Sequence, residues 1–209
     1  FTVPEGFVIE LVASEENGVI NPIDLSFDDA GRLWTQTAEM YPLDPITGIS
    51  FRQVLELMED EEAQANNPNF KRIRDLYQLK TKGTDKILIL DDPTKAATGP
   101  LHVWAGGLSI PQSILPYKDG AYVAHGSELF LLRDTDGDDK ADKMEPILTG
   151  FGFTDTHTMS HLLVRSPGNY IHFSQGALNN GLVTAVASGK TARVDGACQV
   201  RFTLDHQDF

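Results

Sequence analysis

Short alternations of apolar and polar residues, separated by turn signals, run along most of the chain. Side chains of a strand point alternately to its two faces, so this period predicts β-strands with one face in a core. The predicted strands are Phe7–Val12, Ile23–Phe27, Leu33–Thr37, Lys86–Leu90, Ala121–Ala124, Leu129–Leu132, Leu162–Val164, Tyr170–Phe173 and Val200–Leu204. Asp, Asn, Gly and Pro indicate turns at 28–31, 118–120, 166–168 and 180–181. The pattern therefore predicts an all-β fold.

Two levels of repetition underlie these strands. Three hairpins share an apolar strand, a tight turn and an aromatic-bearing strand: NPIDLSFDDAGRLWTQ, IPQSILPYKDGAYVAH and SHLLVRSPGNYIHFSQ. A longer unit occurs twice, as TDKILILDDPTKAATGPLHVWAGGL from Thr84 and as SELFLLRDTDGDDKADKMEPILTGFG from Ser127. Asp92 and Asp134, equivalent in the two copies, stand 42 residues apart. Periods of about 40 to 50 residues built from short strands are typical of propeller blades, so each hairpin is predicted to be the inner pair of a blade.

Residues 41–83 interrupt this pattern with helical character. Ser50 and Gln53 have the spacing of a capping box. Apolar residues follow them at helical spacing: Phe51, Val54, Leu55 and Met58. A shorter helix is predicted at Phe70–Tyr77, after the turn at 66–68. The insertion is either a surface decoration over one blade opening, which costs little loop entropy, or a lid or partner-docking element.

The number of repeats bears on closure of the propeller. With the insertion set aside, the chain supplies about three to four units of this period, whereas propellers close with about four to eight blades. Residues 1–209 are therefore expected to form one partial β-propeller domain of about three to four blades, with the helical insertion at 41–83 inside it. The opening FTVPEGFVIELVA has the pattern of a first strand, which indicates a processed or truncated start. The remaining blades are expected in a longer chain or in another chain.

Composition narrows the range of partners. The net charge of −13 argues against nucleic acid and against an anionic membrane surface as partners. Cys198 is the only cysteine, which excludes an internal disulfide, a CxxCH haem site and a cysteine-based zinc cluster. No stretch approaches the roughly 18 apolar residues of a transmembrane helix, so no membrane span is predicted.

The segment DTDGDDKADKME, residues 134–145, spaces its oxygen ligands as a calcium loop does. The predicted ligands are the side chains of Asp134, Asp136, Asp138, Asp142 and Glu145 and the backbone carbonyl of Lys140. The sixth position, usually Gly, is Asp139, and Asp tolerates positive φ better than most residues. Strand-like flanks indicate a propeller-type loop, in which Glu145 could lie too far along the next strand to bind.

The alternative for this loop is a solvated acidic turn without metal. Alternating carboxylates repel one another unless a cation is present, which favours calcium in a structural role on the outer strands. The equivalent segment of the first copy, DDPTKAATG, lacks the ligand pattern and is predicted to be metal-free.

Candidate acid–base chemistry is densest in DTHTMSH, residues 155–161, where the residues of a propeller's central channel arise. A neutral imidazole here could take a proton from a substrate alcohol, with Asp155 fixing its tautomer. His157 and His161 could instead bind a metal, although that spacing needs a helix and this segment has the pattern of a strand start. A purely structural role, with both histidines hydrogen-bonded within the blade opening, is the third interpretation.

With these motifs the chain resembles the N-terminal half of the PVC-type membrane-bound dehydrogenase domain. The resemblance is carried by FTVPEGFVIELVA, NPIDLSFDDAGRLW, DKILIL, GLSIPQSI, GAYVAHGSELFLLRDTDGDDKAD and GFGFTDTHTMSHLLVRSPGNYIHFSQGALN. That family is similar to the soluble quinoprotein glucose and sorbosone dehydrogenases, six-bladed propellers that use pyrroloquinoline quinone (PQQ). In the glucose dehydrogenases a catalytic histidine precedes a strand-opening leucine by five residues, as His157 precedes Leu162 here.

The resemblance implies a PQQ-type sugar or alcohol dehydrogenase in which His157 takes the hydroxyl proton while hydride passes to the quinone. Asp155 and His161 are its candidate partners, and Gln112 is a candidate cofactor contact from an early blade. A periplasmic or extracellular location is expected, with a cytochrome or another protein chain as electron acceptor. The alternatives are a non-catalytic, calcium-stabilised propeller that binds carbohydrate or a protein partner, and a cation-scavenging surface protein.

Overall fold

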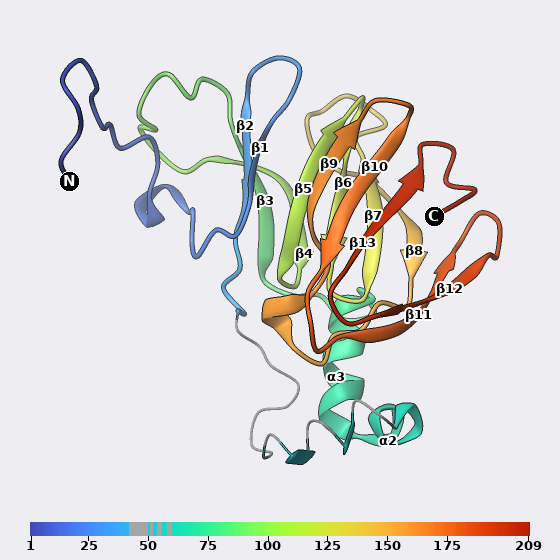
Figure 1. Cartoon of the computed structure of the whole chain (residues 1–209). Helices are drawn as coiled ribbons and strands as arrows, with labels where there is room; N and C mark the ends of the chain where they lie inside the picture. Colours follow the sequence, from blue (N-terminus) through green and yellow to red (C-terminus); the bar gives the residue numbers. More distant parts are fainter. Residues whose placement is uncertain (42–49, 51, 54–55, 58–59) are drawn as a thin grey trace.

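Antiparallel β-sheets make up most of the structure, a computed structural model of the chain (Figure 1). It describes residues 1–41, 50, 52–53, 56–57 and 60–209. Within this part of the chain, thirteen strands form three sheets, and helices are few. The predicted all-β class is therefore confirmed.

The first two sheets are meanders of consecutive strands. The first sheet contains β1 (Leu25–Phe27), β2 (Leu33–Gln36), β3 (Asp85–Leu90) and β4 (His102–Leu108), in that order. The second sheet contains β5 (Pro111–Tyr117), β6 (Gly120–His125), β7 (Glu128–Arg133) and β8 (Lys143–Thr149), and is extended beyond β8 by β11 (Asn180–Ala185) and β12 (Thr191–Asp195). The third sheet contains β9 (His161–Ser166), β10 (Tyr170–Gln175) and β13 (Cys198–Thr203).

The predicted repeats appear in this topology. The three hairpins are β1–β2, β5–β6 and β9–β10, and the two copies of the longer unit are β3–β4 and β7–β8. The first strands of the three sheets, here called the inner strands, are β1, β5 and β9, and β5 contacts both of the others. The repeat in sequence is thus a repeat of antiparallel hairpins placed side by side.

Apolar cores fill the spaces between the sheets. Trp34 and Trp104 of the first sheet pack edge to face, with ring centroids 4.8 Å apart, and join Phe130 of the second sheet in one core. On the other side of the second sheet, Leu129 packs with Phe173 of the third sheet. Because it is covered on both faces, the second sheet has a strand, β6, in which every residue is buried.

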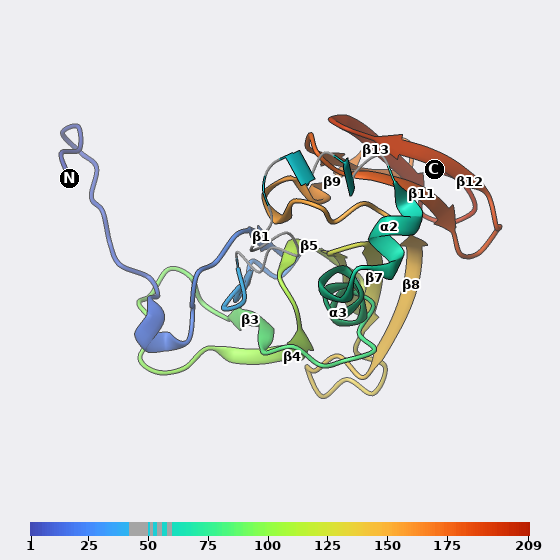
Figure 2. The same ribbon diagram turned by 90° about the horizontal axis from the view of Figure 1, so that it is seen from below.

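Phe7–Val12 does not form the strand that its alternation predicted. The segment has no regular structure, and in Figures 1 and 2 it runs away from the sheets. Its side chains are exposed as far as Leu11, with Phe7 at 69% and Val8 at 80%. A strand needs a neighbour for its backbone hydrogen bonds, and none of the described strands pairs with this segment. The alternation is correct for a strand, but here it has no sheet to join.

The β11–β12 hairpin departs from the simple order of strands. It lies between β10 and β13 in the chain, yet β11 pairs with β8 of the second sheet at Thr184 and Ala185. The strand prediction missed both members, and β12 exposes most of its residues and so lacks a buried face. A hairpin that belongs to one repeat thus extends the sheet of the preceding repeat.

The described part of the insertion begins as the sequence predicts. Ser50 N donates to Gln53 Oε1 (2.8 Å) and Gln53 N donates to Ser50 Oγ (3.3 Å), which is the expected capping box. The apolar residues expected to follow it lie outside the described residues: Phe51, Val54, Leu55 and Met58. Helix α2 (Glu61–Asn66) comes next, and α3 (Pro68–Tyr77) confirms the predicted second helix.

Helix α3 is built into the body of the protein, at the lower end of the sheets (Figures 1 and 2). Phe70, Ile73 and Tyr77, spaced along one face, are all 0% exposed. They form one core with Phe153 and Met159, which flank the predicted histidine site. The apolar face of the insertion therefore lies directly beneath that site.

Two buried titratable side chains face each other at the β6–β7 turn, where α3 docks. His125 Nδ1 donates to the carbonyl of Tyr77 (2.9 Å), so its Nε2 accepts from Ser109 N (2.8 Å). Glu128 accepts a hydrogen bond from Gln78 Nε2 (3.3 Å). Burial lowers the pKa of His125 to about 4 and raises the pKa of Glu128 to about 7. Both side chains are therefore mostly neutral between pH 5 and 6.

Glu128→Gln is expected to change the pH dependence of stability. The pKa of Glu128 is higher in the folded than in the unfolded chain, so its contribution is fully present below pH 4.5 and lost as the pH rises through about 7. Glutamine keeps the hydrogen-bond acceptor but does not ionise. The unfolding free energy of the variant, relative to wild type, should therefore rise by about 3 kcal/mol between these pH values.

Urea denaturation at a series of pH values measures this difference. His125 contributes with the opposite sign but is common to both proteins, so its contribution cancels. Glu62→Gln, an exposed change on α2, is the matched control and should follow wild type throughout. A constant offset between Glu128→Gln and wild type across the window would contradict the prediction.

Candidate functional site

The starts of the three inner strands are joined by hydrogen bonds between equivalent positions of the repeat. Asp24, just before β1, accepts through Oδ2 from Ser113 Oγ (2.6 Å) and from Ile114 N (3.0 Å) of β5. Ser113 Oγ in turn accepts from Leu163 N of β9 (2.9 Å). The side chains of Asp24 and Ser113 and the backbone N of Leu163, at the same point of each hairpin, thus align the ends of β1, β5 and β9.

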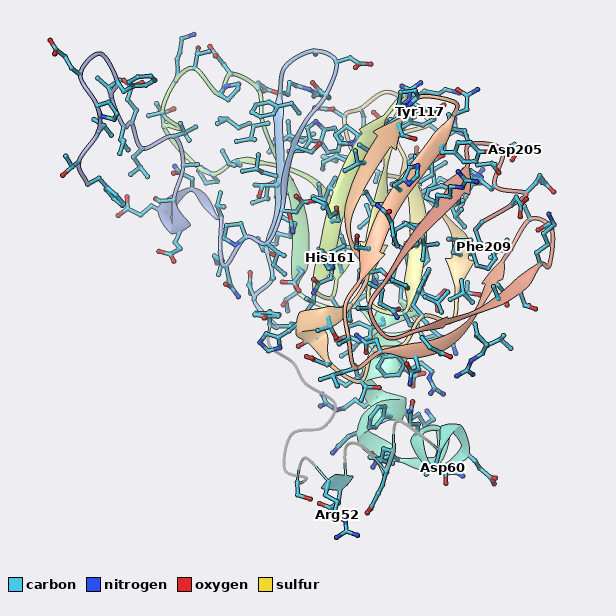
Figure 3. All side chains as sticks on the ribbon, in the orientation of Figure 1. Arg52, Asp60, Tyr117, His161, Asp205 and Phe209 are labelled. Atoms are coloured by element: carbon cyan, nitrogen blue, oxygen red, sulfur yellow. The ribbon has the colours of Figure 1, made fainter. Side chains whose placement is uncertain are left out.

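A cleft of about 400 Å³ opens at these strand starts. Its lining residues are Asn21, Pro22, Ile23, Asp24, Tyr41, Gln112, His157, His161 and Leu162. The structure therefore brings Gln112, from the start of β5, together with His157 and His161, although these residues are far apart in the sequence. Figure 3 labels His161 at the start of β9.

Asp155 shapes the turn that carries His157. It is the N-cap of η2 (Thr156–Thr158), and its Oδ1 accepts from both the backbone N (2.9 Å) and the ring Nδ1 (3.1 Å) of His157. Because Nδ1 donates its proton to this carboxylate, Nε2 carries the lone pair and is the ring nitrogen left for the cleft. The tautomer-fixing contact expected from the sequence is present, and the imidazole is 59% exposed.

Asn179 holds this turn in place and was not singled out in the sequence. Its Oδ1 accepts from Asp155 N (3.1 Å), and its Nδ2 donates to the carbonyl of Asp155 (2.9 Å) and to Thr158 Oγ1 (2.9 Å). Asn179 is itself 0% exposed. An asparagine in a turn is a common loop residue, so the sequence offered no signal for this role.

The segment between Asp155 and His161 is a 3₁₀ turn followed by a strand, where the sequence pattern indicated only the start of a strand. Capping by Asp155 produces the turn, η2 ends at Thr158, and β9 begins at His161. The two histidines therefore do not share a helix. His161 Nδ1 donates to the carbonyl of Met159 (2.8 Å), and Gln112 Nε2 donates to the carbonyl of Thr156 (3.3 Å).

Tyr41 is one of the lining residues of the cleft that the sequence did not reveal. It is the last described residue before 42–49, and its ring packs against that of His157 with centroids 5.1 Å apart and planes at 63°. Burial and, after it, the charge of Asp155 raise the pKa of the Tyr41 phenol, which therefore stays neutral. One sequence signal could have identified Tyr41: it is an aromatic residue at the point where the repeat ends and the insertion begins.

The predicted metal loop connects β7 to β8. Asp134, Asp136 and Asp138 each offer a carboxylate oxygen, and these atoms lie within 4.8 Å of one another. The loop turns back at Gly137 (φ 80°) and at Asp139 (φ 64°), so the sixth position does adopt the positive φ expected of it. Asp134 stabilises this turn by accepting from Gly137 N (2.7 Å) and Asp139 N (3.0 Å).

Of the other predicted ligands, Asp142 and Glu145 are not part of this group of carboxylates. Asp142 accepts from Thr135 N (3.1 Å), and Lys140 lies in the same loop before it. Glu145 belongs to β8, where an ion pair with Lys143 (2.8 Å) lowers its pKa. Glu145 is thus placed along the next strand, as the strand-like flanks indicated.

The metal loop also docks on the first sheet. Arg32 Nη1 donates to both oxygens of Asp139 (3.0 Å), and His102 Nε2 lies 3.5 Å from one of them. Asp92, the equivalent of Asp134 in the first copy of the repeat, is hydrogen-bonded by Lys95, which lowers its pKa to about 2. The two copies therefore place their equivalent aspartates in different surroundings.

A family model described as "Domain of unknown function (DUF7133)" matches residues 1–209. The chain belongs to the DUF7133 family. No curated protein matches it. The described helices of this DUF7133 chain include none that is long and apolar enough to cross a membrane.

The cleft of this DUF7133 domain is suited to hydrogen bonding and proton transfer. Of the residues that line it, Asp24 is the acidic one, and no Arg or Lys is among those that the structure describes. Two imidazoles with bonded Nδ1 atoms, the amide of Gln112 and the phenol of Tyr41 supply both donors and acceptors. A neutral, hydroxyl-rich small molecule fits this set better than an anion does.

Proposed function

We propose that the cleft binds a sugar or an alcohol, and that the protein is a quinoprotein-type (PQQ-type) dehydrogenase in which His157 removes the hydroxyl proton. The observation that carries the proposal is the bond from His157 Nδ1 to Asp155, which leaves Nε2 as a lone-pair nitrogen in the cleft. A general base needs such a nitrogen within reach of the proton it abstracts. The resemblance of the DTHTMSH segment to the quinoprotein dehydrogenases supports the reaction class.

Proton abstraction is the step that the residues of the cleft perform. The substrate hydroxyl donates to His157 Nε2, and as the proton moves across, the Asp155 carboxylate stabilises the imidazolium that forms. Gln112 and His161 line the same cleft and can hold further hydroxyls of the substrate. A bound quinone would supply the hydride acceptor.

The lining residues do not fit the quinone itself. PQQ carries several carboxylates, and among the described residues of the lining there is no Arg or Lys to pair with them, while Asp24 adds negative charge. Cations that hold a quinone would have to come from another sheet. This observation favours the second candidate, a non-catalytic calcium-stabilised module that binds carbohydrate or a protein partner.

The three sheets are proposed to be consecutive blades of a β-propeller, six-bladed by the resemblance. Two four-stranded meanders with neighbouring inner strands support this architecture. The second sheet is covered on both faces, whereas the inner strands of the outer two sheets each expose apolar side chains. Leu25 and Phe27 of β1 are 62% and 57% exposed, and Leu162 and Val164 of β9 are 59% and 49% exposed. Further blades would cover these faces and surround the cleft, where they could supply the missing cations.

Two measurements test the function. In the first, chains with ¹⁵N-labelled histidine are titrated with aldoses, ketoses and simple alcohols, and the ring resonances of His157 are followed. In the second, dye reduction is assayed with PQQ, calcium and the same compounds. Shifts of His157 together with quinone-dependent dye reduction would support the dehydrogenase. Shifts without turnover would support the carbohydrate-binding module. The absence of both would refute the dehydrogenase and carbohydrate binding, and would leave the protein-binding module as the candidate.

The proposed dehydrogenase would act in the periplasm or outside the cell. Its electrons would pass to a cytochrome or to another protein chain. Localisation of the tagged protein in cell fractions tests the first point, and reduction of an added cytochrome during turnover tests the second.

Calcium is proposed as the ion of the β7–β8 loop. The close approach of the Asp134, Asp136 and Asp138 carboxylates supports this, because like charges at that distance repel one another unless a cation lies between them. The carbonyl of Lys140 is the fourth candidate ligand. Because the loop docks on the first sheet through Asp139, a bound ion would stabilise the contact between two sheets and would take no part in chemistry at His157.

Calcium is expected to raise the melting temperature of wild type. A ligand that binds only the folded state stabilises it by about 2.7 kcal/mol at 100 times its Kd, or roughly 5 to 10 °C for a chain of this size. Asp138→Asn removes one charge from the group and should reduce the shift. Asp92→Asn, at the position of the first copy that is equivalent to Asp134, removes one charge outside the calcium loop; it is the control and should respond as wild type does. Differential scanning calorimetry with EGTA or with millimolar calcium measures the shift, and equal shifts in wild type and Asp138→Asn would disprove the site.

A further inference from the structure

The imidazole of His157 has few contacts that hold its orientation. It is 59% exposed, and the bond from Nδ1 to Asp155 is the hydrogen bond that fixes its ring. An exposed side chain of this kind can leave a single rotamer at little cost, because the entropy it regains offsets one weak contact. A base that must present Nε2 to a substrate needs a second restraint.

Tyr41 supplies a contact of the required kind. Its ring packs on the imidazole edge to face, at a centroid distance of 5.1 Å and an interplanar angle of 63°. Such pairs contribute about 0.5–1.5 kcal/mol beyond the area they bury, and they have a preferred geometry. The ring therefore occupies a side of the imidazole that the Asp155 bond leaves open.

Tyr41 is itself held by the body of the protein. Its backbone N donates to the carbonyl of Ala38 (2.9 Å), which also accepts from Asn21 Nδ2 (3.1 Å). The side chain packs against the buried core that contains Phe70 and Ile73 of α3. The core of the insertion is thereby connected through one ring to the imidazole in the cleft.

We propose that Tyr41 is a positioning residue for His157, and that through it the 41–83 insertion determines how the base faces the cleft. The proposal rests on the proposed role of His157 as a base. The aromatic ring of Tyr41 orients the imidazole. The neutral phenol hydroxyl lies at the cleft but does not replace the imidazole as proton acceptor. The packed helix α3 makes the insertion a support for the site.

The test compares Tyr41→Phe, which keeps the ring, with Tyr41→Leu and Tyr41→Ala, which remove it. The ¹⁵N shifts of His157 Nδ1 and Nε2 report the tautomer, and the line widths report ring mobility. Tyr170→Ala is the matched control, because it removes a ring in a similar edge-to-face contact with His172, at 6.4 Å and 66°. Melting temperatures of all variants show whether they are folded, and Tyr41→Leu, which fills more of the space, serves if Tyr41→Ala does not fold.

The loss of the ring is expected to shift and broaden the His157 resonances, whereas Tyr41→Phe and Tyr170→Ala leave them at their wild-type positions. Turnover, where it is detected, should fall about 10- to 100-fold in kcat with a smaller change in KM for Tyr41→Leu, and change little for Tyr41→Phe. Wild-type His157 resonances in Tyr41→Leu would overturn the proposal, as would an equal loss of kcat in Tyr41→Phe. The resonances can be recorded without turnover. A wild-type protein that neither binds sugar nor shows turnover would refute the dehydrogenase, and the resonances of the Tyr41 variants would still test whether Tyr41 orients His157.

Discussion

Replacing His157 with alanine is expected to lower kcat/KM for a sugar or alcohol by about 10²- to 10⁴-fold. The variant loses the nitrogen that accepts the hydroxyl proton, whereas the turn beneath it should persist. That turn is held by backbone and Asn179 contacts, including Asn179 Nδ2 to the carbonyl of Asp155 (2.9 Å), none of which uses the imidazole. A steady-state dye-reduction assay with PQQ and calcium measures the loss, and an unchanged melting temperature shows that the fold is intact.

Two further measurements separate a base from a residue that only binds. Added imidazole should partly restore the turnover of His157→Ala, because it can enter the space that the side chain vacates and accept the proton. His172→Ala is the control, since this histidine lies on β10 outside the cleft lining. Wild-type activity in His157→Ala would remove this residue from the mechanism and leave His161 as the other imidazole of the cleft.

Tyr77→Ala is expected to lower the free energy of unfolding by about 3–5 kcal/mol, the range for loss of a buried aromatic ring. Tyr77 is 0% exposed, and its ring packs edge to face on Phe153, with centroids 5.6 Å apart. For a chain of this length the loss corresponds to a melting temperature lower by roughly 6 to 20 °C. Urea denaturation followed by tryptophan fluorescence measures the change, since Trp34 and Trp104 lie between the sheets.

The same experiment decides between two descriptions of the insertion. Arg72→Ala, an exposed change on the same helix, is the matched control and should leave stability within about 0.5 kcal/mol of wild type. If α3 opened independently as a lid, Tyr77→Ala would detach the helix while the unfolding of the sheets stayed at its wild-type midpoint. A single, lowered transition is expected, because Phe70, Ile73 and Tyr77 share one core with Met159 and Phe153.

Hairpins could be predicted from the sequence because each depends on residues close together in the chain. The turn at Lys118 and Asp119, for example, joins β5 to β6, and Tyr117 pairs with Gly120 across it. Phe7–Val12 has the same alternation but remains outside the sheets. A period of two residues shows that a segment can be a strand, but it cannot show whether a neighbouring strand is within reach.

The two candidate sites also differ in how far apart their residues lie in the sequence. The acidic group at Asp134, Asp136 and Asp138 lies within one short loop, so its spacing alone predicted that the carboxylates would meet. The contact of Asp155 with His157 is equally local. Tyr41 and Gln112 reach the cleft from other parts of the chain. Gln112 was a candidate only through the family resemblance, and no pattern in the sequence links Tyr41 to His157.

The sequence by itself determined the all-β class, the repeated hairpins, the second helix of the insertion and the local groups at 134–138 and 155–157. Each follows from backbone period, capping or spacing over a few residues. The tertiary structure alone decided that β11–β12 extends the second sheet, that Phe7–Val12 stays unpaired, and that the insertion supports the cleft through Tyr41. These outcomes depend on which apolar surfaces meet in space, because burial and side-chain contacts between distant segments are settled only when the sheets pack.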